Sequence, residues 1–166
     1  ANTQEKYLQA ALDLTWIMIR QFWDEQKDGF FFTSHNVDEG VPRLKEIYDG
    51  AIPSGNSVAL LNLLRLSQLT NETVFENYAK KLLKTFAEEV RNQPIGHAFL
   101  LVGLEFALGP TFNVVLVGDP GDKDTVEMME ALRRVYLPNL TVKIWTPKST
   151  NPTAFGLVYE KIDGKT

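Results

Sequence analysis

A polar, glycine-containing segment at residues 46–57 carries the side chains of this sequence that are best suited to chemistry. Its two carboxylates, Glu46 and Asp49, can serve as a general acid and a general base if their environments separate their pKa values. The other polar residues of the segment are Tyr48, Ser54, Asn56 and Ser57. So many polar groups in one loop need partners, water or a ligand. We therefore expect a ligand where this segment enters the apolar helix that follows.

The same segment also fits a purely structural role. Ser54 and Ser57 can cap the following helix, because a hydroxyl oxygen accepts hydrogen bonds from the free N–H groups of a first helical turn. Gly50 and Gly55 supply backbone freedom. Both interpretations stand at this stage.

A second candidate group lies where the first expected helix ends. Trp23 precedes the carboxylates of Asp24 and Glu25, and three phenylalanines follow at residues 30–32. Such pairings bind sugars, with an apolar ring under the pyranose and carboxylates on its hydroxyls. The alternative places Trp23 in the core and Asp24 in solvent at a helix end. The predicted ligand-binding residues are Trp23, Asp24, Tyr48, Ser54 and Asn56.

Two further titratable residues lie on an apolar helix expected at residues 97–108. His97, at its start, can act as a proton shuttle, although a lone histidine in such a place is more often a hydrogen-bonded structural residue. Glu105 must be paired, protonated or directed into a cavity, because its surroundings are apolar. The catalytic candidates are Glu46, Asp49, His97 and Glu105.

The composition is that of one ordinary soluble domain. The 166 residues are 44% hydrophobic and 23% charged, which is sufficient for a real core. A formal charge of −4 without a cluster of lysine and arginine argues against nucleic acid as a partner. No apolar run reaches the roughly 18 residues that cross a bilayer, so we expect no membrane partner.

The sequence lacks the residues that several kinds of site and catalysis require. The absence of cysteine excludes disulfides, thiolate catalysis and cysteine–zinc sites, and it fits a reducing compartment, so we expect a cytoplasmic protein. Two histidines are too few for most metal sites, and we expect neither a metal nor a cofactor. No Gly-x-Ser-x-Gly sequence supports acyl transfer.

Periodicity predicts a helical first part, residues 1–110. Helical spacing of apolar residues indicates helices at residues 5–24, 57–69, 72–91 and 97–108, with a short strand at 30–33. The helix at 72–91 has one apolar face, whereas those at 57–69 and 97–108 are apolar nearly all round. This alternation is typical of two helical layers, an inner and an outer one. Helical hairpins are therefore expected.

The sequence pattern changes from mainly helical to alternating strand and helix in the second part, residues 111–166. A β-branched run at 113–117, a helical pattern at 122–136 and a second β run at 140–145 predict one right-handed βαβ unit. A last strand is expected at 156–162. The acidic turn at 118–122 lies where such folds bind phosphate, but its aspartates would repel one, and we interpret it as structural. The fold class is thus mainly α with an α/β part.

Four segments together carry a family resemblance. Residues 22–25, 29–33, 45–57 and 115–122 closely resemble the C-terminal region of the thioredoxin-domain-containing proteins of the DUF255 type, which include the YyaL-like and spermatogenesis-associated-protein-20-like proteins. The resemblance covers nearly the whole chain in order. It implies a thioredoxin-like domain, absent here, followed by an (α/α)6 toroid similar to six-hairpin glycosidases and N-acylglucosamine 2-epimerases.

The resemblance leaves two functions open. The first is a carbohydrate-active or carbohydrate-binding module, because epimerase-like toroids place catalytic groups at one end of their inner helices, here near Glu46, Asp49, Ser54, Asn56 and His97. The second is a non-catalytic scaffold or interaction domain that serves the thioredoxin-like domain. An incomplete toroid would also expose helix faces, and a homodimer of the fragment is a further expectation.

Overall fold

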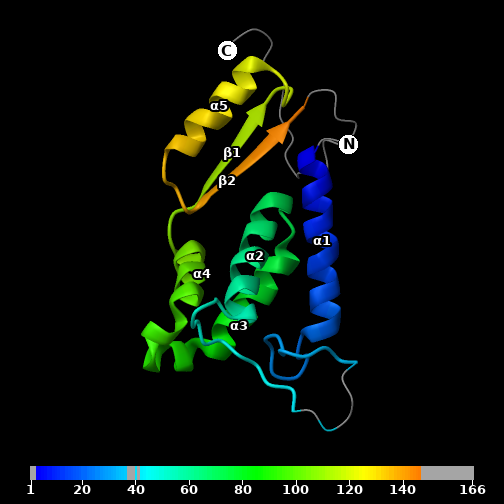
Figure 1. Cartoon of the computed structure of the whole chain (residues 1–166), viewed down its shortest axis with the longest axis vertical. Coiled ribbons are helices and arrows are strands. Elements are labelled where there is room, and N and C mark those ends of the chain that lie inside the picture. The colour runs from blue at the N-terminus through cyan, green and yellow to red at the C-terminus, as the bar shows by residue number, and fades with distance from the viewer. Residues whose placement is uncertain (1–2, 37–39, 41, 147–166) are drawn as a thin grey trace.

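The computed structural model describes residues 3–36, 40 and 42–146, and within them the chain is mainly helical with a small parallel sheet (Figure 1). This confirms the predicted fold class at the level of helices followed by an α/β part. The elements are α1 (Thr3–Phe22), α2 (Gly55–Thr70), α3 (Thr73–Asn92), the 3-10 turn η1 (Pro94–His97), α4 (Ala98–Leu108), β1 (Phe112–Val117), α5 (Lys123–Arg134) and β2 (Leu140–Trp145). The strand expected at 156–162 lies outside the described residues.

Helix α2 forms the centre of the molecule. Its leucines are buried on nearly all sides, as the continuous apolar sequence predicted. Ser54 caps its N-terminus by accepting a hydrogen bond from the Ser57 N–H at 3.1 Å. Asn71 ends the helix in the left-handed conformation, with φ of 59°. Asn71 thus separates α2 from α3, as the gap between the helices expected at residues 57–69 and 72–91 requires.

The helices on either side of α2 differ from each other. Helix α3 buries one face, formed by Phe75, Ala79, Leu82, Phe86 and Val90, and exposes its charged face. Helix α4 approaches α2 closely because Gly103 lacks a side chain, and a Cβ there would lie 2.6 Å from a methyl carbon of Leu60. The far side of α4 is exposed at Val102 and Leu108. A helix that is apolar all round is therefore covered on one side only in the described structure.

The loop after α1 differs from its prediction. Instead of a strand at residues 30–33, the structure has one isolated antiparallel bridge between Trp23 and Phe30. The backbone N–H and C=O of Phe30 both bond the side chain of Asn56. That side chain occupies the edge on which a neighbouring strand would pair, so no ladder extends along the segment.

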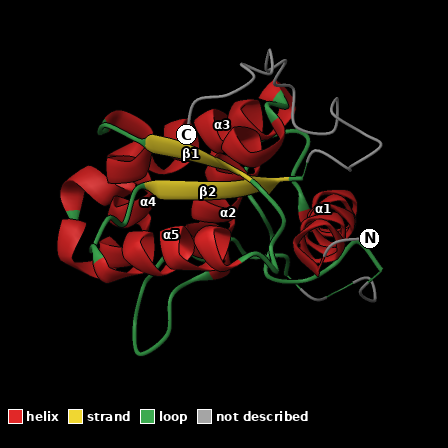
Figure 2. Cartoon of the chain, turned by 90° about the horizontal axis from the view of Figure 1, so that it is seen from above, coloured by secondary structure: helices red, strands yellow, loops and turns green. Residues whose placement is uncertain are grey.

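The second part is a βαβ unit stacked on one end of the helices. Strands β1 and β2 run parallel, with Phe112 opposite Leu140 and Val117 opposite Trp145. Figure 2 shows α5 alongside the two strands, and β2 contacts α2. Asp122 is the N-cap residue of α5, and Lys123 pairs with Glu127 on the first turns of this helix at 3.7 Å. No described helix has the length and apolarity needed to cross a membrane.

Candidate functional site

The segment at residues 46–57 lines a pocket of about 200 Å³ at the N-terminus of α2. Four of the predicted site residues meet there, namely Glu46, Tyr48, Ser54 and Asn56. The aromatic side chains of Phe31 and Phe32 complete one wall. The structure thus brings together about half of the predicted set, and the chemistry of the pocket depends on which polar atoms remain free.

Tyr48 supplies the aromatic surface of this pocket. Its side chain is 57% exposed, and the ring lies against two glycines. A Cβ on Gly50 or Gly96 would lie 3.1 or 3.2 Å from ring atoms, so the absence of side chains at both positions makes room for the ring. Gly50 thus has a packing role besides any backbone freedom.

Asn56 uses its whole amide group on the backbone. Its side-chain oxygen accepts a hydrogen bond from Phe30 N–H at 2.8 Å, and its Nδ2 donates to Phe30 O at 2.8 Å and to Glu46 O at 2.9 Å. The residue is 3% exposed. Asn56 therefore joins three segments, the loop after α1, the polar segment and α2.

Asp49 binds the N-terminus of α4. One carboxylate oxygen accepts hydrogen bonds from the N–H groups of Phe99 at 2.8 Å and Leu100 at 3.0 Å, and the other accepts one from Ser54 N–H at 2.8 Å. Burial alone would raise the pKa of Asp49, but these donors outweigh burial and lower it below its usual value. The carboxylate is thus held ionised at the positive end of a helix.

His97 and Ser54 are also engaged inside the protein. His97 is 2% exposed, and its Nδ1 lies 2.8 Å from Ile47 O, to which it donates because a carbonyl oxygen only accepts. The Ser54 hydroxyl donates to the Ser57 hydroxyl at 2.8 Å while it caps α2. Both side chains fix the polar segment against the helices.

Glu105 lies far from this pocket, on the exposed side of α4. Its Oε1 accepts a hydrogen bond from Asn139 Nδ2 at 2.8 Å, which links α4 to the turn before β2. Of the three expected alternatives, paired, protonated or directed into a cavity, the structure shows a paired carboxylate. Within the described residues, no group of histidines and carboxylates could hold a metal ion.

Trp23 and Asp24 lie on the other side of Phe31, at a second pocket of about 660 Å³. The Trp23 ring is fully buried and packs edge-on against Phe30 and Tyr78, at centroid distances of 4.9 and 4.8 Å. Its faces therefore lie in the core, as the structural alternative proposed. The predicted ligand-binding residues are divided between two pockets that share Phe31.

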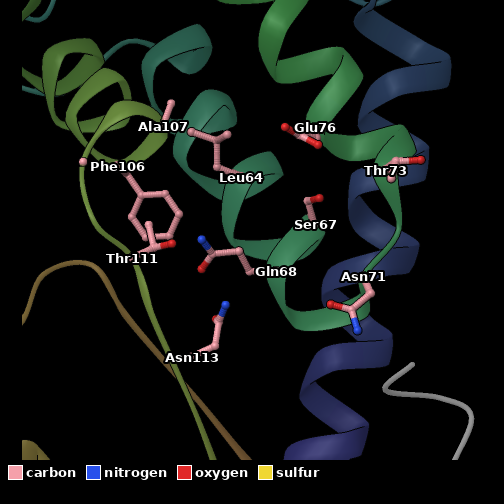
Figure 3. A pocket seen from close by; sticks show the side chains of 11 residues that line it. Leu64, Ser67, Gln68, Asn71, Thr73, Glu76, Phe106, Ala107, Thr111 and Asn113 are labelled. Carbon is pink, nitrogen blue, oxygen red and sulfur yellow. The ribbon is translucent and has the colours of Figure 1, made fainter. Parts of the chain in front are cut away.

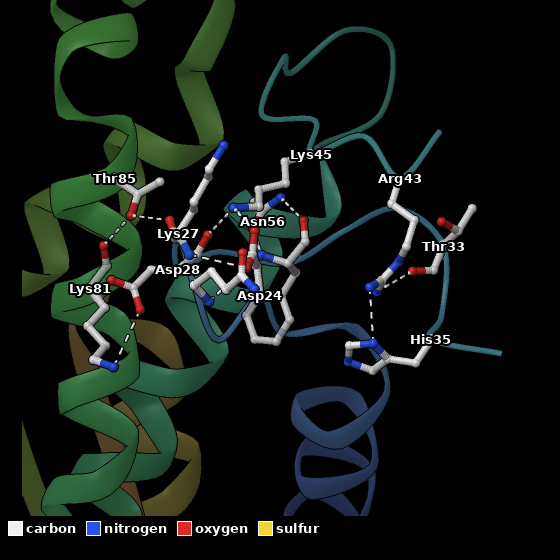
Figure 4. A network of polar contacts seen from close by, with 12 residues as sticks. Asp24, Lys27, Asp28, Thr33, His35, Arg43, Lys45, Asn56, Lys81 and Thr85 are labelled. Atoms are coloured by element: carbon white, nitrogen blue, oxygen red, sulfur yellow. Dashed lines mark hydrogen bonds and ion pairs between the residues drawn. The ribbon is translucent and has the colours of Figure 1, made fainter. Parts of the chain in front are cut away.

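Asp24 organises the turn after α1 (Figure 4). Its Oδ1 accepts hydrogen bonds from Gln26 N–H at 2.9 Å and Lys27 N–H at 3.1 Å, and its Oδ2 forms an ion pair with Lys45 at 2.7 Å. Burial raises the pKa of Asp24, but the Lys45 hydrogen bond, the two backbone donors and the Lys45 charge lower it from 3.8 to about 2. Asp24 is not a free group at a helix end.

This shift predicts an acid-sensitive contribution to stability. The folded-state pKa of Asp24 is depressed, so its contribution is complete above pH 3.8 and is lost as the pH falls towards 2. After allowance for solvent screening at the pocket rim, the wild type should lose about 1 to 2 kcal/mol more than Asp24→Asn over this range. Urea unfolding at several pH values measures it. An equal loss in both proteins would contradict the assignment, and the exposed Glu25→Gln is the matched control.

A third pocket, of about 350 Å³, lies between the helices and the βαβ unit, and it was not predicted from the sequence. Figure 3 shows Gln68 and Asn113 extending into the same space beside the ring of Phe106. Gln68 Oε1 accepts a hydrogen bond from Thr141 Oγ1 at 2.9 Å, which ties α2 to β2. The polar residues that line this third pocket lie on separate elements, so no spacing in the sequence indicates the pocket.

Sequence reasoning also missed the cations of the second pocket, Arg43 and Lys45. The alternation Arg43-Leu44-Lys45 was the available signal, because residues two apart in an extended segment lie on the same side. Both cations lie over the Phe31 ring, at 3.9 and 5.1 Å from its centroid.

Comparison with known proteins finds several relatives, and no family model matches the chain. The chain is 32% identical over 156 residues to spermatogenesis-associated protein 20 of Rattus norvegicus, 32% to that of Homo sapiens and 31% to that of Mus musculus. The aligned region is 93% of this chain but 19, 20 and 19% of those proteins. The chain thus spans about one fifth of the length of these relatives.

Proposed function

We propose that this chain, which is homologous to a region of spermatogenesis-associated protein 20 as its sequence predicted, is a non-catalytic scaffold and interaction region. In a longer protein it would support the thioredoxin-like domain that the resemblance implies. The helices would form part of a larger helical toroid, and the βαβ unit would be attached to one end of it.

The proposal rests on the hydrogen-bond partners of the polar side chains at residues 46–57. Asp49 and Asn56 direct their hydrogen bonds to backbone groups of the chain itself. A sugar-cleaving pair needs one carboxyl group with a raised pKa to act as an acid. Asp49, one member of the predicted pair, instead has a lowered pKa and directs both carboxylate oxygens to backbone N–H groups, so it is held as a carboxylate. This favours a supporting role.

The exposed apolar residues at α4 favour an interaction role. Ile95 of the preceding turn η1 is 91% exposed and Val102 of α4 is 44% exposed, although α4 is apolar nearly all round. Exposed apolar surface of this kind is typical of a face that another part of a protein covers. In the longer relatives, four fifths of the chain is available to do so.

Association with the remaining part of a full-length relative tests the proposal. This chain is titrated by calorimetry with human spermatogenesis-associated protein 20 from which the aligned region has been removed. We expect binding that Ile95→Asp with Val102→Asp weakens at least about tenfold. The matched control, Val126→Asp with Met128→Asp on α5, should bind as the wild type does. No association, or equal weakening by the control, would reject the scaffold proposal.

A second candidate function, carbohydrate binding, is favoured by the exposed Tyr48 ring beside the exposed carboxylate of Glu46. A ring face next to a carboxylate suits a pyranose. If a sugar binds there, Tyr48→Ala and Glu46→Gln should each lower its affinity about tenfold in a glycan titration. Tyr7→Ala, at another exposed tyrosine, on α1, is the control. Affinities that are unchanged by both substitutions would rule this candidate out.

A further inference from the structure

Arg43 is held in a fixed position without an acidic partner. Its Nη1 donates a hydrogen bond to His35 Nδ1 at 3.0 Å, and its Nη2 donates to Thr33 O at 3.1 Å (Figure 4). The guanidinium lies 3.9 Å from the Phe31 ring centroid. Both acceptors are neutral, since an arginine only donates and His35 Nδ1 must therefore be unprotonated. No carboxylate among the described residues forms an ion pair with Arg43.

Arg43 is one of three described residues that carry a buried side-chain atom without a hydrogen-bond partner. Over the described part of the chain, the buried side-chain atoms that lack a hydrogen bond are Trp23 Nε1, Thr33 Oγ1 and Arg43 Nε. Trp23 and Arg43 both line the pocket of about 660 Å³, and Thr33 is bonded to Arg43 through its carbonyl oxygen. Folded proteins leave few buried polar groups unsatisfied. The unpartnered Nε of Arg43, on a residue that lines the pocket, therefore indicates a bound hydrogen-bond acceptor.

The charges of the pocket define that group. Lys45 is neutralised by Asp24 at 2.7 Å, so it does not require a further anion. An arginine has five N–H donors, and Arg43 uses two of them, which leaves three for a ligand. A guanidinium with free N–H groups matches the planar, two-oxygen geometry of a carboxylate. Leu44, which also lines the pocket and is exposed, offers apolar surface to the body of such a ligand.

We propose that the pocket around Arg43 is a binding site for a small organic carboxylate. The carboxylate lies against the guanidinium of Arg43, and the apolar part of the ligand lies against Leu44 and Phe31. The site adjoins the pocket at residues 46–57 through Phe31, and it requires no catalytic role for the chain.

Benzoate is the probe, with NMR detection of the Trp23 indole N–H and the Arg43 side chain. We expect saturable shifts of both signals with a millimolar Kd, and no shifts with neutral benzyl alcohol. Arg43→Gln should abolish binding, and Arg43→Lys, which keeps the charge but not the planar donor set, should weaken it about tenfold. Arg65→Gln is the matched control, because Arg65 of α2 lies over the Phe106 ring of α4, outside this pocket.

Further comparisons make the result decisive. Inorganic phosphate should bind more weakly than benzoate, since it has no apolar part to lie against Leu44 and Phe31, and equal binding would replace the proposal by a general anion site. The variant Asp38→Asn with Glu39→Gln removes two carboxylates close to Arg43 in the sequence. It should bind benzoate at least as well as the wild type. The proposal would be overturned if only this double variant bound benzoate, or if neither it nor the wild type did. It would also be overturned if folded Arg43→Gln and Arg43→Lys bound benzoate as the wild type does.

Discussion

Replacing Asn56 by alanine is expected to lower the free energy of unfolding by about 3 to 5 kcal/mol. The substitution removes three hydrogen bonds and leaves two buried backbone groups of Phe30, together with Glu46 O, without their partner. An unsatisfied buried group costs about 1 to 3 kcal/mol, and the alanine side chain provides no replacement donor or acceptor. Urea unfolding followed by circular dichroism measures the effect.

The control for this prediction lies on the same helix. Asn62→Ala makes the same chemical change at an exposed position of α2. It should alter the unfolding free energy by less than about 0.5 kcal/mol. If Asn56→Ala were as mild as Asn62→Ala, the amide of Asn56 would not be joining the three segments.

Replacing Asp49 by alanine should lower the unfolding free energy by about 2 to 4 kcal/mol. The N–H groups of Ser54, Phe99 and Leu100 lose a charged acceptor, and the N-terminus of α4 loses its compensating negative charge. Part of the loss is recovered by water, because Asp49 is only half-buried. Asp13→Ala, which removes an exposed carboxylate bonded to Gln9, is the matched control and should have a small effect.

The effect of Asp49 should also depend on pH. Because its pKa is lowered in the folded state, its contribution is complete above the ordinary value of 3.8 and declines as the pH falls below it. The difference in unfolding free energy between wild type and Asp49→Ala should therefore shrink on acidification. A difference that grows at low pH would mean that the carboxyl group acts in its protonated form.

The regular elements could be predicted from the sequence because their signals are local. The two-faced pattern of α3 and the β runs of β1 and β2 depend on neighbouring residues alone, and the structure has these elements within a few positions of the expected ranges. The strand expected at residues 30–33 was wrong for a non-local reason. Asn56 is 26 residues from Phe30 and occupies the edge that a pairing strand would need.

The location of the pocket could be predicted, but the partners of its residues could not. A polar segment before an apolar helix indicated the place, and Glu46, Tyr48, Ser54 and Asn56 do line one pocket. The donors to Asp49 at Phe99 and Leu100 lie 50 and 51 residues away in the sequence. No spacing within the segment shows that a helix N-terminus from another part of the chain will meet that carboxylate.

Amide hydrogen exchange of the ligand-free protein tests the central claim most directly. If the polar side chains of residues 46–57 bind the protein's own backbone, the N–H groups of Phe30, Ser54, Phe99 and Leu100 are protected without any ligand. Phe30 should lose this protection in Asn56→Ala, and the other three in Asp49→Ala. Rapid exchange of all four in the wild type, with protection only after a sugar is added, would show that these side chains serve a ligand.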